Sequence, residues 1–409
     1  MRAGIGIVDI TPPLGVELAG YGYYLKRRCD SIRDRVYARA VLLEHQGDRQ
    51  LIVSFDLLGI SQEVTDSLIR AAASLNISRE RVIAVSVHTH TGPAVKYHLG
   101  CGEVNDDYVA ALERKMVPLL EDAQEDLADV SRLLYTRTAV PGDYIYNRAA
   151  PEDGPVDRDA RGFLLERRGK PQILLASAAC HGVFLKCVSC VSADFSGELH
   201  RRCHDAGIRS IYLNGLCGDI DPWRSSPERM AEYTENLFET LHRESNYREL
   251  PPTLSGGRIP FVLRLSPFTR EEIHVVAAQA VEKAGGPGIP AARCALAWEE
   301  EMLWQFDTLT ADEPGDAAFC ILGGIPIIAL PFEGYTGIGM DFRRMIGCED
   351  ALVLGCAEQL RGYLPTRDDF LRGSYAAKES MFLYRRLPPV PGEAERLAEQ
   401  LAEGFNALR

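Results

Sequence analysis

Two histidines, His88 and His90, stand two residues apart directly after an apolar, β-branched stretch. Residues 81–87 predict a buried strand, and Thr-Gly-Pro at 91–93 ends it. In extended backbone, side chains at i and i+2 lie on one face, about 7 Å apart. The pair can therefore serve one site, with one histidine as a metal ligand and the other as a second ligand or a proton carrier. The alternative is a pair of solvated loop histidines.

Other apolar segments also end on side chains that can hold a metal or work beside one. Two or three imidazoles with a carboxylate form the ligand set of a catalytic zinc site that leaves a position open for water. Each residue alone has an ordinary explanation, as a buried histidine, a helix cap or a turn residue. Together they favour one site where several strand ends converge. These strand-end residues are Asp56, His88 and His90, His181, Asp219 and Asp221, and Glu333.

The elements before the histidines form a recognisable unit. Residues 36–45 and 50–58 predict a hairpin that turns at 46–48, residues 61–75 a helix, and residues 83–87 the next strand. This strand–helix–strand order places the histidine pair at a carboxyl edge, where open α/β sheets bind their ligands.

The rest of the chain continues the alternation of strands and helices. The sequence predicts an α/β fold of layered mixed β-sheets flanked by helices, as one large catalytic domain over residues 1–409. Further strands are expected at 172–179, 210–213, 255–265 and 351–355, with a strand pair in 317–330. Helices are expected at 105–129, 227–244, 269–283 and 391–408.

Composition restricts the function further. The 409-residue chain has a net charge of −13 and no Lys/Arg run, which argues against nucleic-acid binding. Its 11 cysteines lie mostly in apolar segments, as expected of core thiols in a reducing cytoplasm. No stretch predicts a membrane span, a signal peptide, a Walker A loop, a GxGxxG motif or a GxSxG elbow. A small-molecule substrate is expected, and a homo-oligomer is the common default.

Several segments together resemble the N-terminal zinc amidase domain of the neutral ceramidase family. His-Thr-His-Thr-Gly-Pro at 88–93 resembles the family's His-Thr-His-Ser-Gly-Pro signature, the most specific match. The other matching segments, spread over nearly the whole chain, are Ala3–Pro13, Gly20–Gly22, Asn147-Arg148, Cys180-His181, Ser192–Gly197, Pro331–Glu333, Gly362–Thr366 and Tyr375.

The resemblance implies a role for each matching residue. It implies one zinc ion on His88, His181, Glu333 and Tyr363. His90 is then the proton donor or transition-state stabiliser beside the metal. Arg148 and Tyr375 hold the carbonyl oxygen or its developing charge.

Three features depart from the family pattern. The family's Gly-Asp-Val-Ser-Pro loop is Gly-Asp-Ile-Asp-Pro at 218–222, so Asp221 replaces an active-site serine. An acid there can act as a general base or contact a cationic substrate group. The sequence also shows no secretion signal and no C-terminal immunoglobulin-like domain.

These features predict a zinc-dependent hydrolase that cleaves an amide bond of a soluble, polar substrate. An esterase or deacetylase that uses the same metal, and a catalytically inactive, metal-stabilised binding protein, are the alternatives.

Overall fold

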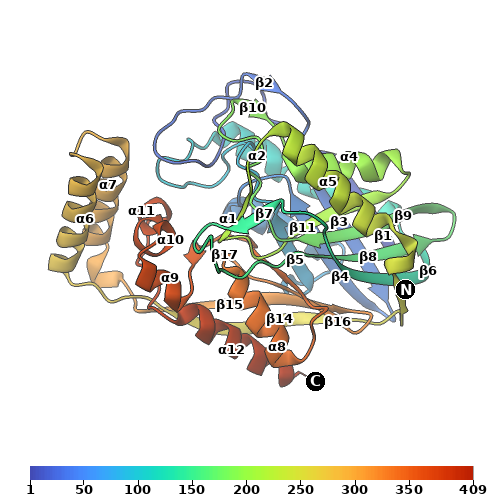
Figure 1. Ribbon diagram of the computed structural model, residues 1–409. Coiled ribbons are helices and arrows are strands. Elements are labelled where there is room, and N and C mark those ends of the chain that lie inside the picture. Colours follow the sequence, from blue (N-terminus) through green and yellow to red (C-terminus); the bar gives the residue numbers. More distant parts are fainter. Residues whose placement is uncertain (409) are drawn as a thin grey trace.

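Two facing β-sheets with helices on their outer sides form the body of the protein (Figure 1). The computed structural model describes residues 1–408. The larger sheet has nine strands in the order β11-β9-β8-β6-β1-β3-β4-β5, with β13 also paired to β6. Its strands are β1 (Arg2–Asp9), β3 (Tyr37–His45), β4 (Asp48–Phe55), β5 (Val82–Ser86), β6 (Ala128–Ala139), β8 (Asp159–Arg167), β9 (Lys170–Ala178), β11 (Arg209–Asn214) and β13 (Arg248–Leu250).

The smaller sheet has four strands in the order β14-β15-β16-β18 and mixes antiparallel and parallel pairs. Side chains of both sheets meet in one apolar cluster, in which Val85 and Ile211 of the large sheet lie with Cys320 and Ile327 of the small one. This burial is the main stabilising term of the two-sheet arrangement. The strands are β14 (Leu254–Arg264), β15 (Asp312–Leu322), β16 (Ile325–Ala329) and β18 (Leu352–Leu354).

Helices cover the outer sides of both sheets (Figure 1). The large sheet carries α1 (Gln62–Ser74), α2 (Asp106–Glu113), α3 (Met116–Glu125), α4 (Phe195–Asp205) and α5 (Pro227–His242). The small sheet carries α8 (Thr336–Ile346) and α12 (Glu393–Asn406). Together with the two sheets, these helices confirm the predicted layered α/β fold.

Smaller elements lie around one edge of this body. The helix pair α6 (Arg270–Ala284) and α7 (Pro290–Trp304) stands to one side in Figure 1, next to three short helices. These are α9 (Arg367–Arg372), α10 (Tyr375–Lys378) and α11 (Ser380–Tyr384). Three two-stranded ribbons complete the fold: β2 (Ser31–Ile32) with β10 (Cys190–Val191), β7 (Ile145–Asn147) with β12 (Ile220–Pro222), and β17 (Glu333–Gly334) with β19 (Tyr363–Leu364).

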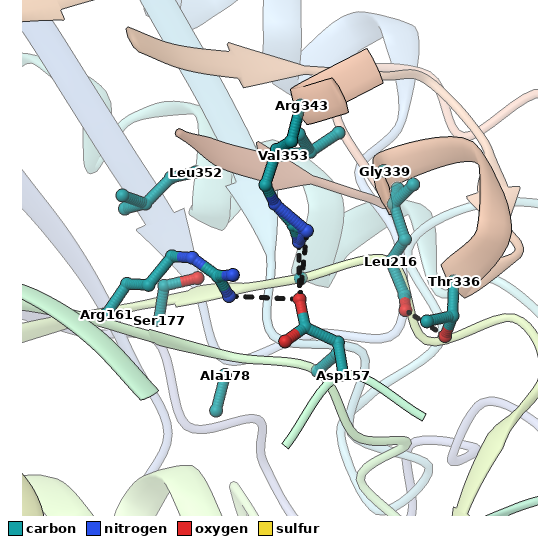
Figure 2. Close-up of a pocket in the computed structure, with 12 residues that line it drawn as sticks. Asp157, Arg161, Ser177, Ala178, Leu216, Thr336, Gly339, Arg343, Leu352 and Val353 are labelled. Carbon is teal, nitrogen blue, oxygen red and sulfur yellow. Dashed lines mark hydrogen bonds and ion pairs between the residues drawn. The ribbon is translucent and has the colours of Figure 1, made fainter. Parts of the chain in front are cut away.

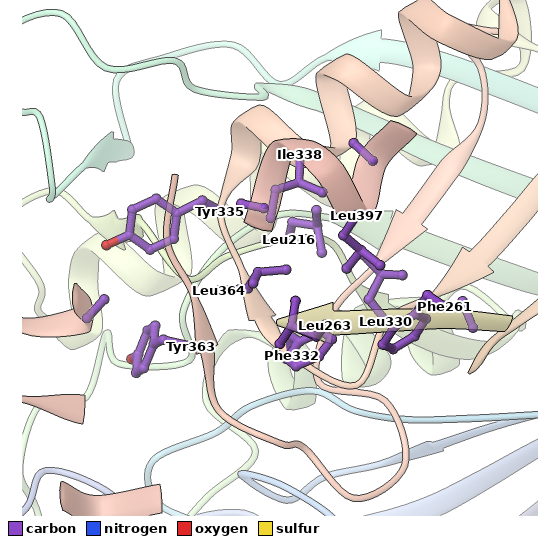
Figure 3. Packing of buried hydrophobic residues seen from close by; sticks show 14 of the residues in the cluster. Leu216, Phe261, Leu263, Leu330, Phe332, Tyr335, Ile338, Tyr363, Leu364 and Leu397 are labelled. Atoms are coloured by element: carbon purple, nitrogen blue, oxygen red, sulfur yellow. The ribbon is translucent and has the colours of Figure 1, made fainter. Parts of the chain in front are cut away.

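The apolar cluster beneath α8 and α12 ends at two tyrosines. In Figure 3 the rings of Tyr335 and Tyr363 lie at its margin, with their hydroxyls directed away from Phe332 and Leu364. The aromatic rings add buried apolar surface while the hydroxyls remain free to bond polar groups. This cluster therefore sets the position of one wall of the candidate site described below.

A buried group of ion pairs attaches α8 to the large sheet (Figure 2). Asp157 accepts hydrogen bonds from Arg161 of β8 at 2.9 Å and from Arg343 of α8 at 3.0 Å. The adjoining cavity of about 10 Å³ has room for little more than a single water molecule. Asp157 thus joins β8 to α8, and the cavity beside it is too small to hold a ligand.

Several helices differ from the sequence-based prediction, which also lacked α4, α8 and the short helices α9 to α11. The single helix expected at 105–129 is wrong, because the chain breaks at Arg114-Lys115 and restarts as α3. The restart places Pro118 in the first turn, where its missing N–H leaves no bond unmade. Helix α7 was not predicted, because the Gly/Pro-rich stretch at 284–290 obscured a start at Pro290. No helix within residues 1–408 is long and apolar enough to cross a membrane.

Candidate metal centre

Three segments that follow strands of the large sheet meet at one point. His88 follows β5, His181 follows β9, and Asn214 ends β11. The Asn214 side-chain amide donates to the carbonyl of Val87 at 3.0 Å and to that of Cys180 at 3.1 Å. One buried amide therefore joins the residues that directly precede the two histidines.

The backbone around His88 is closely packed and partly strained. His88 has φ +63°, which side chains rarely adopt, and its N–H donates to the Leu57 carbonyl at 2.9 Å. Gly182 lies against it, and a Cβ there would sit 2.9 Å from the His88 carbonyl oxygen. The Gly182 carbonyl also accepts from the N–H of His90 at 3.1 Å. These contacts hold the segment that carries His88 and His90 at a fixed distance from the segment that carries His181.

Three imidazoles face one another in this buried space. The ring centroids of His88 and His181 are 4.7 Å apart, and His90 lies 5.0 Å from His88 and 5.6 Å from His181. One nitrogen from each ring lies within 4.8 Å of the others. Burial lowers the pKa of His90 well below its ordinary value, and the neighbouring His88 and His181 add to this. His90 is therefore neutral and can bind a metal or accept a proton.

Hydrogen bonds fix which nitrogens of His88 and His181 point into the centre. Nδ1 of His88 lies 2.8 Å from the Leu58 carbonyl oxygen, and Nδ1 of His181 lies 3.2 Å from that of Ile220. A carbonyl accepts only, so both Nδ1 atoms carry hydrogen and both Nε2 atoms are left to face the centre.

Glu333 stands opposite these two Nε2 atoms. Its Oε2 lies 3.1 Å from Nε2 of His88 and 3.3 Å from Nε2 of His181. Although burial alone would raise it, the pKa of Glu333 is held well below its ordinary value by His88 and His181. Although burial alone would lower it, Cys217 and the hydrogen bond to Glu333 raise the pKa of His181 above its ordinary value, so its Nε2 carries a proton that a metal ion would have to displace. With that proton displaced, the two Nε2 atoms and the carboxylate can bind one cation. His88 Nε2 and both ring nitrogens of His90 are buried without a hydrogen-bond partner among the described residues. This donor set fits a zinc ion, with outer carbonyls orienting the imidazoles.

Tyr363 reaches the centre beside Glu333, because β17 and β19 pair in parallel with these two residues in register. The Arg148 guanidinium donates from Nη2 to the Tyr363 hydroxyl at 2.8 Å and to the Gly218 carbonyl at 2.8 Å. Its Nη1 donates to Oδ1 of Asp221 at 3.2 Å, and this carboxylate oxygen also lies 3.6 Å from Nδ1 of His181. Arg148 thus joins the tyrosine and the aspartate at the edge of the centre.

Asp219 has a supporting position. Its Oδ1 accepts from the N–H and hydroxyl of Thr336, its Oδ2 accepts from Asn147, and its backbone carbonyl accepts from the Arg148 N–H at 2.8 Å. Burial raises its pKa to about 6 despite these hydrogen bonds.

Asp219 should make stability depend on pH. A carboxyl whose native pKa is raised binds its proton more tightly when folded, so it stabilises at low pH. That contribution is lost as pH rises from about 4 through about 6. The free energy of unfolding of wild type relative to Asp219→Asn should fall by roughly 2.5 kcal/mol between pH 4 and pH 7, at 1.36 kcal/mol per pKa unit. Urea unfolding of both proteins across this range measures the difference, and a pH-independent difference would contradict the assignment.

Two tyrosines outside the predicted set of site residues contact the centre. The Tyr384 hydroxyl donates to Oε1 of Glu333, and its ring packs edge-on against His98 at 4.7 Å. The Tyr21 ring lies 4.9 Å from that of His90. Gly20 has φ +86°, and a Cβ there would sit 2.4 Å from His90 Nδ1, so the chain approaches this ring too closely for a side chain. Tyr21 lies in the family-like segment Gly20–Gly22, although no role was predicted for it, whereas Tyr384 lies in no segment that the sequence singled out.

The remaining sequence-based candidates lie at different distances from the centre. Tyr375 packs edge-on against Tyr363 at 5.8 Å and is 42% exposed, which places it at the outer margin. Asp56 is directed elsewhere: Oδ2 accepts from Arg39 at 2.7 Å and from the Tyr37 N–H at 2.8 Å. Its role is to hold β3 against the end of β4.

Replacing Tyr384 by phenylalanine should weaken zinc binding by about 10- to 100-fold, the usual effect of losing a hydrogen bond to a ligating group. The reason is that Oε1 of Glu333 loses its donor, so the carboxylate is less firmly oriented. Competition with a chelator measures the affinity. Tyr375→Phe is the matched control. Tyr375 is 42% exposed at the outer margin, where its ring packs against Tyr363, so this variant should leave the affinity unchanged. Equal affinities in all three proteins would show that Tyr384 does not orient Glu333.

Comparisons with known proteins bear on the fold that carries this centre. The sequence model of the family described as neutral/alkaline non-lysosomal ceramidase, N-terminal, matches residues 1–105. Two solved structures match all of this chain at 18% identity: neutral ceramidase from Pseudomonas aeruginosa, with 74% of that chain covered and a TM-score of 0.76, and a structure titled "Ceramidase complexed with C2", with 75% covered and a TM-score of 0.74. A search of curated proteins found no match. The chain therefore has the fold of neutral ceramidase, and the resemblance predicted from its sequence is confirmed.

Proposed function

We propose that this protein is a zinc-dependent amidohydrolase that cleaves an amide bond of a small, polar substrate. The observation that carries the proposal is Glu333, whose carboxylate faces Nε2 of His88 and Nε2 of His181 in a buried space. The fold shared with two ceramidases supports amide hydrolysis as the reaction. A bound zinc ion supplies Lewis acidity and lowers the pKa of a water molecule to near neutrality.

The protein's own groups have separate roles in this proposal. His88, His181 and Glu333 hold the metal, with Tyr363 as the fourth candidate ligand. Arg148 donates to the carbonyl oxygen of the substrate and to the negative charge that develops on it. Asp221 orients Arg148 through their hydrogen bond. The neutral His90 donates a hydrogen bond from one of its two unpartnered ring nitrogens and so stabilises the transition state beside the metal. Tyr375, at the exposed margin, contacts the substrate.

We also propose that the enzyme is cytoplasmic and consists of one catalytic domain. All 11 cysteines are free thiols, which supports a reducing compartment such as the cytoplasm. The candidate residues run from His88 to Tyr375 and come from both sheets and their connecting loops, which supports one catalytic domain over residues 1–409. The charged pair Arg148–Asp221 at the edge of the centre supports a polar substrate over a long-chain lipid amide.

The test is metal analysis of the purified protein together with turnover of matched compounds. We expect about one zinc per chain, and hydrolysis of the N-acyl compound of a pair that differs only in N-acyl and O-acyl linkage. A ceramide serves as the lipid comparison. Turnover of the O-acyl partner alone would favour the esterase. Bound zinc without hydrolysis of any compound would favour the metal-stabilised binding protein, and absence of zinc would overturn the proposal.

A further inference from the structure

The ribbon formed by β7 and β12 has a buried face and an open face beside the candidate metal centre. In each strand the two outer residues are buried and the central residue is partly exposed. The ladder continues past each strand, because the N–H groups of Arg148 and Trp223 donate to carbonyls of the opposite segment at 2.8 and 2.7 Å. Successive side chains of a strand point to opposite faces. The open face therefore carries Tyr146, Arg148, Asp221 and Trp223.

The side chains on this open face form two pairs. Nη1 of Arg148 donates to Oδ1 of Asp221 at 3.2 Å, and Arg148 also reaches Tyr363 at the metal centre. The rings of Tyr146 and Trp223 pack edge to face, with their centroids 5.2 Å apart. Residues two apart in a strand are separated by about 7 Å, so the aromatic pair lies about one such step farther from the centre than the charged pair. Trp223 is 44% exposed, which opens this end of the face to solvent.

Three polar groups of the open face have no partner within the protein. Among the described residues, no hydrogen bond engages the Tyr146 hydroxyl, Nε1 of Trp223 or Oδ2 of Asp221. Burial and the Asp221 carboxylate raise the pKa of Tyr146, so its hydroxyl keeps its proton and can donate. The face thus offers two donors and one acceptor beside two aromatic rings.

The charges of this face favour a neutral ligand. The Asp221 carboxylate is already paired with Arg148, and the Arg224 guanidinium lies over the Trp223 ring at 5.7 Å. An ammonium group placed here would meet two cations against one carboxylate. A long acyl chain would remove water from the ion pair without replacing its hydrogen bonds. A ring with hydroxyl groups avoids both costs, because its hydroxyls bond the polar groups and its C–H faces pack on the aromatic rings.

We propose that Tyr146, Asp221 and Trp223, which we call the aromatic shelf, bind a neutral, hydroxylated ring joined to the scissile amide. The substrate class is then an acylated amino sugar or a similar cyclic amino polyol. Oδ2 of Asp221 accepts from a ring hydroxyl, and Nε1 of Trp223 and the Tyr146 hydroxyl donate to ring oxygens. The substrate class rests on the amide hydrolysis proposed above, whereas binding of the ring does not require it.

Isothermal titration calorimetry of the metal-loaded protein with methyl glucoside tests the aromatic shelf without hydrolysis, because this sugar has no amide bond. We expect saturable binding of one molecule per chain, at least about tenfold tighter than that of methoxycyclohexane, whose six-membered ring lacks the sugar hydroxyls. Trp223→Ala should weaken the binding of methyl glucoside by at least about tenfold, as expected of an aromatic anchor. Trp304→Ala, the same change at a residue that is 86% exposed at the end of α7, should leave affinity within about twofold.

Turnover of N-acetylglucosamine links the aromatic shelf to the substrate class. Trp223→Ala should raise KM by at least about tenfold and change kcat less, because the shelf binds the ring equally in the ground state and in the transition state. Hydrolysis of other amides but not of acylated amino sugars would overturn the substrate class.

The binding results decide the aromatic shelf separately from the proposed function. The shelf is overturned if methyl glucoside does not bind saturably, if it binds no tighter than methoxycyclohexane, or if Trp223→Ala and Trp304→Ala weaken its binding equally. Hydrolysis of N-acyl compounds together with any of these results would leave the proposed function standing. Binding that depends on Trp223, without hydrolysis of any amide, would support the shelf and overturn the proposed function.

Discussion

Replacing His88 by alanine should reduce bound zinc from about one per chain to a small fraction and abolish hydrolysis. His88 supplies one of the two Nε2 atoms that face Glu333, and its ring is fixed by the Leu58 carbonyl. Without it, Glu333 and His181 remain as an incomplete ligand set. Metal activation contributes several kcal/mol to transition-state stabilisation. Since each 1.36 kcal/mol is a factor of ten, kcat/KM should fall by at least about a thousandfold.

The control for this variant is His242→Ala, which removes an exposed imidazole stacked on Phe238 at 5.0 Å, on α5. It should keep its zinc and full activity. Treatment of wild type with a chelator should reproduce the His88→Ala phenotype, and added zinc should restore activity to wild type alone. Full activity in His88→Ala, or a zinc content equal to that of wild type, would contradict the ligand assignment.

The parts of the fold that follow from local patterns could be predicted from the sequence. The hairpin of β3 and β4, the helix α1 and the strand β5 each depend on periodic burial and on turn residues close by. The turn has Gln46 and Gly47 at φ +52° and +92°, as the Gln-Gly-Asp break indicated. The placement of histidines at strand ends follows from the same patterns, so the centre was visible as a group of strand-end residues.

The contacts that complete the centre depend on packing between distant segments. Tyr384 reaches Glu333 because α11 is held by the Leu99 N–H on the Leu383 carbonyl and by Trp298 of α7 packed on Phe382. Neither contact has a periodic or motif signal. The same holds for β17 and β19, which are two residues each and too short for a pattern. Asp56 shows the reverse error: a carboxylate at a strand end looked like a site residue, but Arg39 holds it elsewhere.

Replacing Arg148 by alanine should lower kcat by about 100- to 1,000-fold while bound zinc stays near one per chain, the effect expected for loss of a donor to a developing negative charge. Arg148 contacts Tyr363 and Asp221 but none of the three imidazoles, so its loss removes charge stabilisation and leaves the metal-binding nitrogens in place. Arg148→Lys should recover little activity, because an ammonium cannot bond Tyr363, Gly218 and Asp221 with a planar fork. Asp221→Asn should have a smaller effect, since the amide oxygen still accepts from Nη1.

Single-turnover rates and zinc content, measured on the same preparations, separate these effects. Arg158→Ala is the matched control, because this arginine pairs with the exposed Asp143 at 3.4 Å outside the centre, and its activity should equal that of wild type. Because substrate carbonyl oxygens carry little charge before reaction, the loss in Arg148→Ala should appear in kcat more than in KM. Zinc lost together with activity would make Arg148 a structural support of Tyr363. An unchanged kcat would remove it from the reaction and leave Tyr375 as the remaining donor to the substrate oxygen.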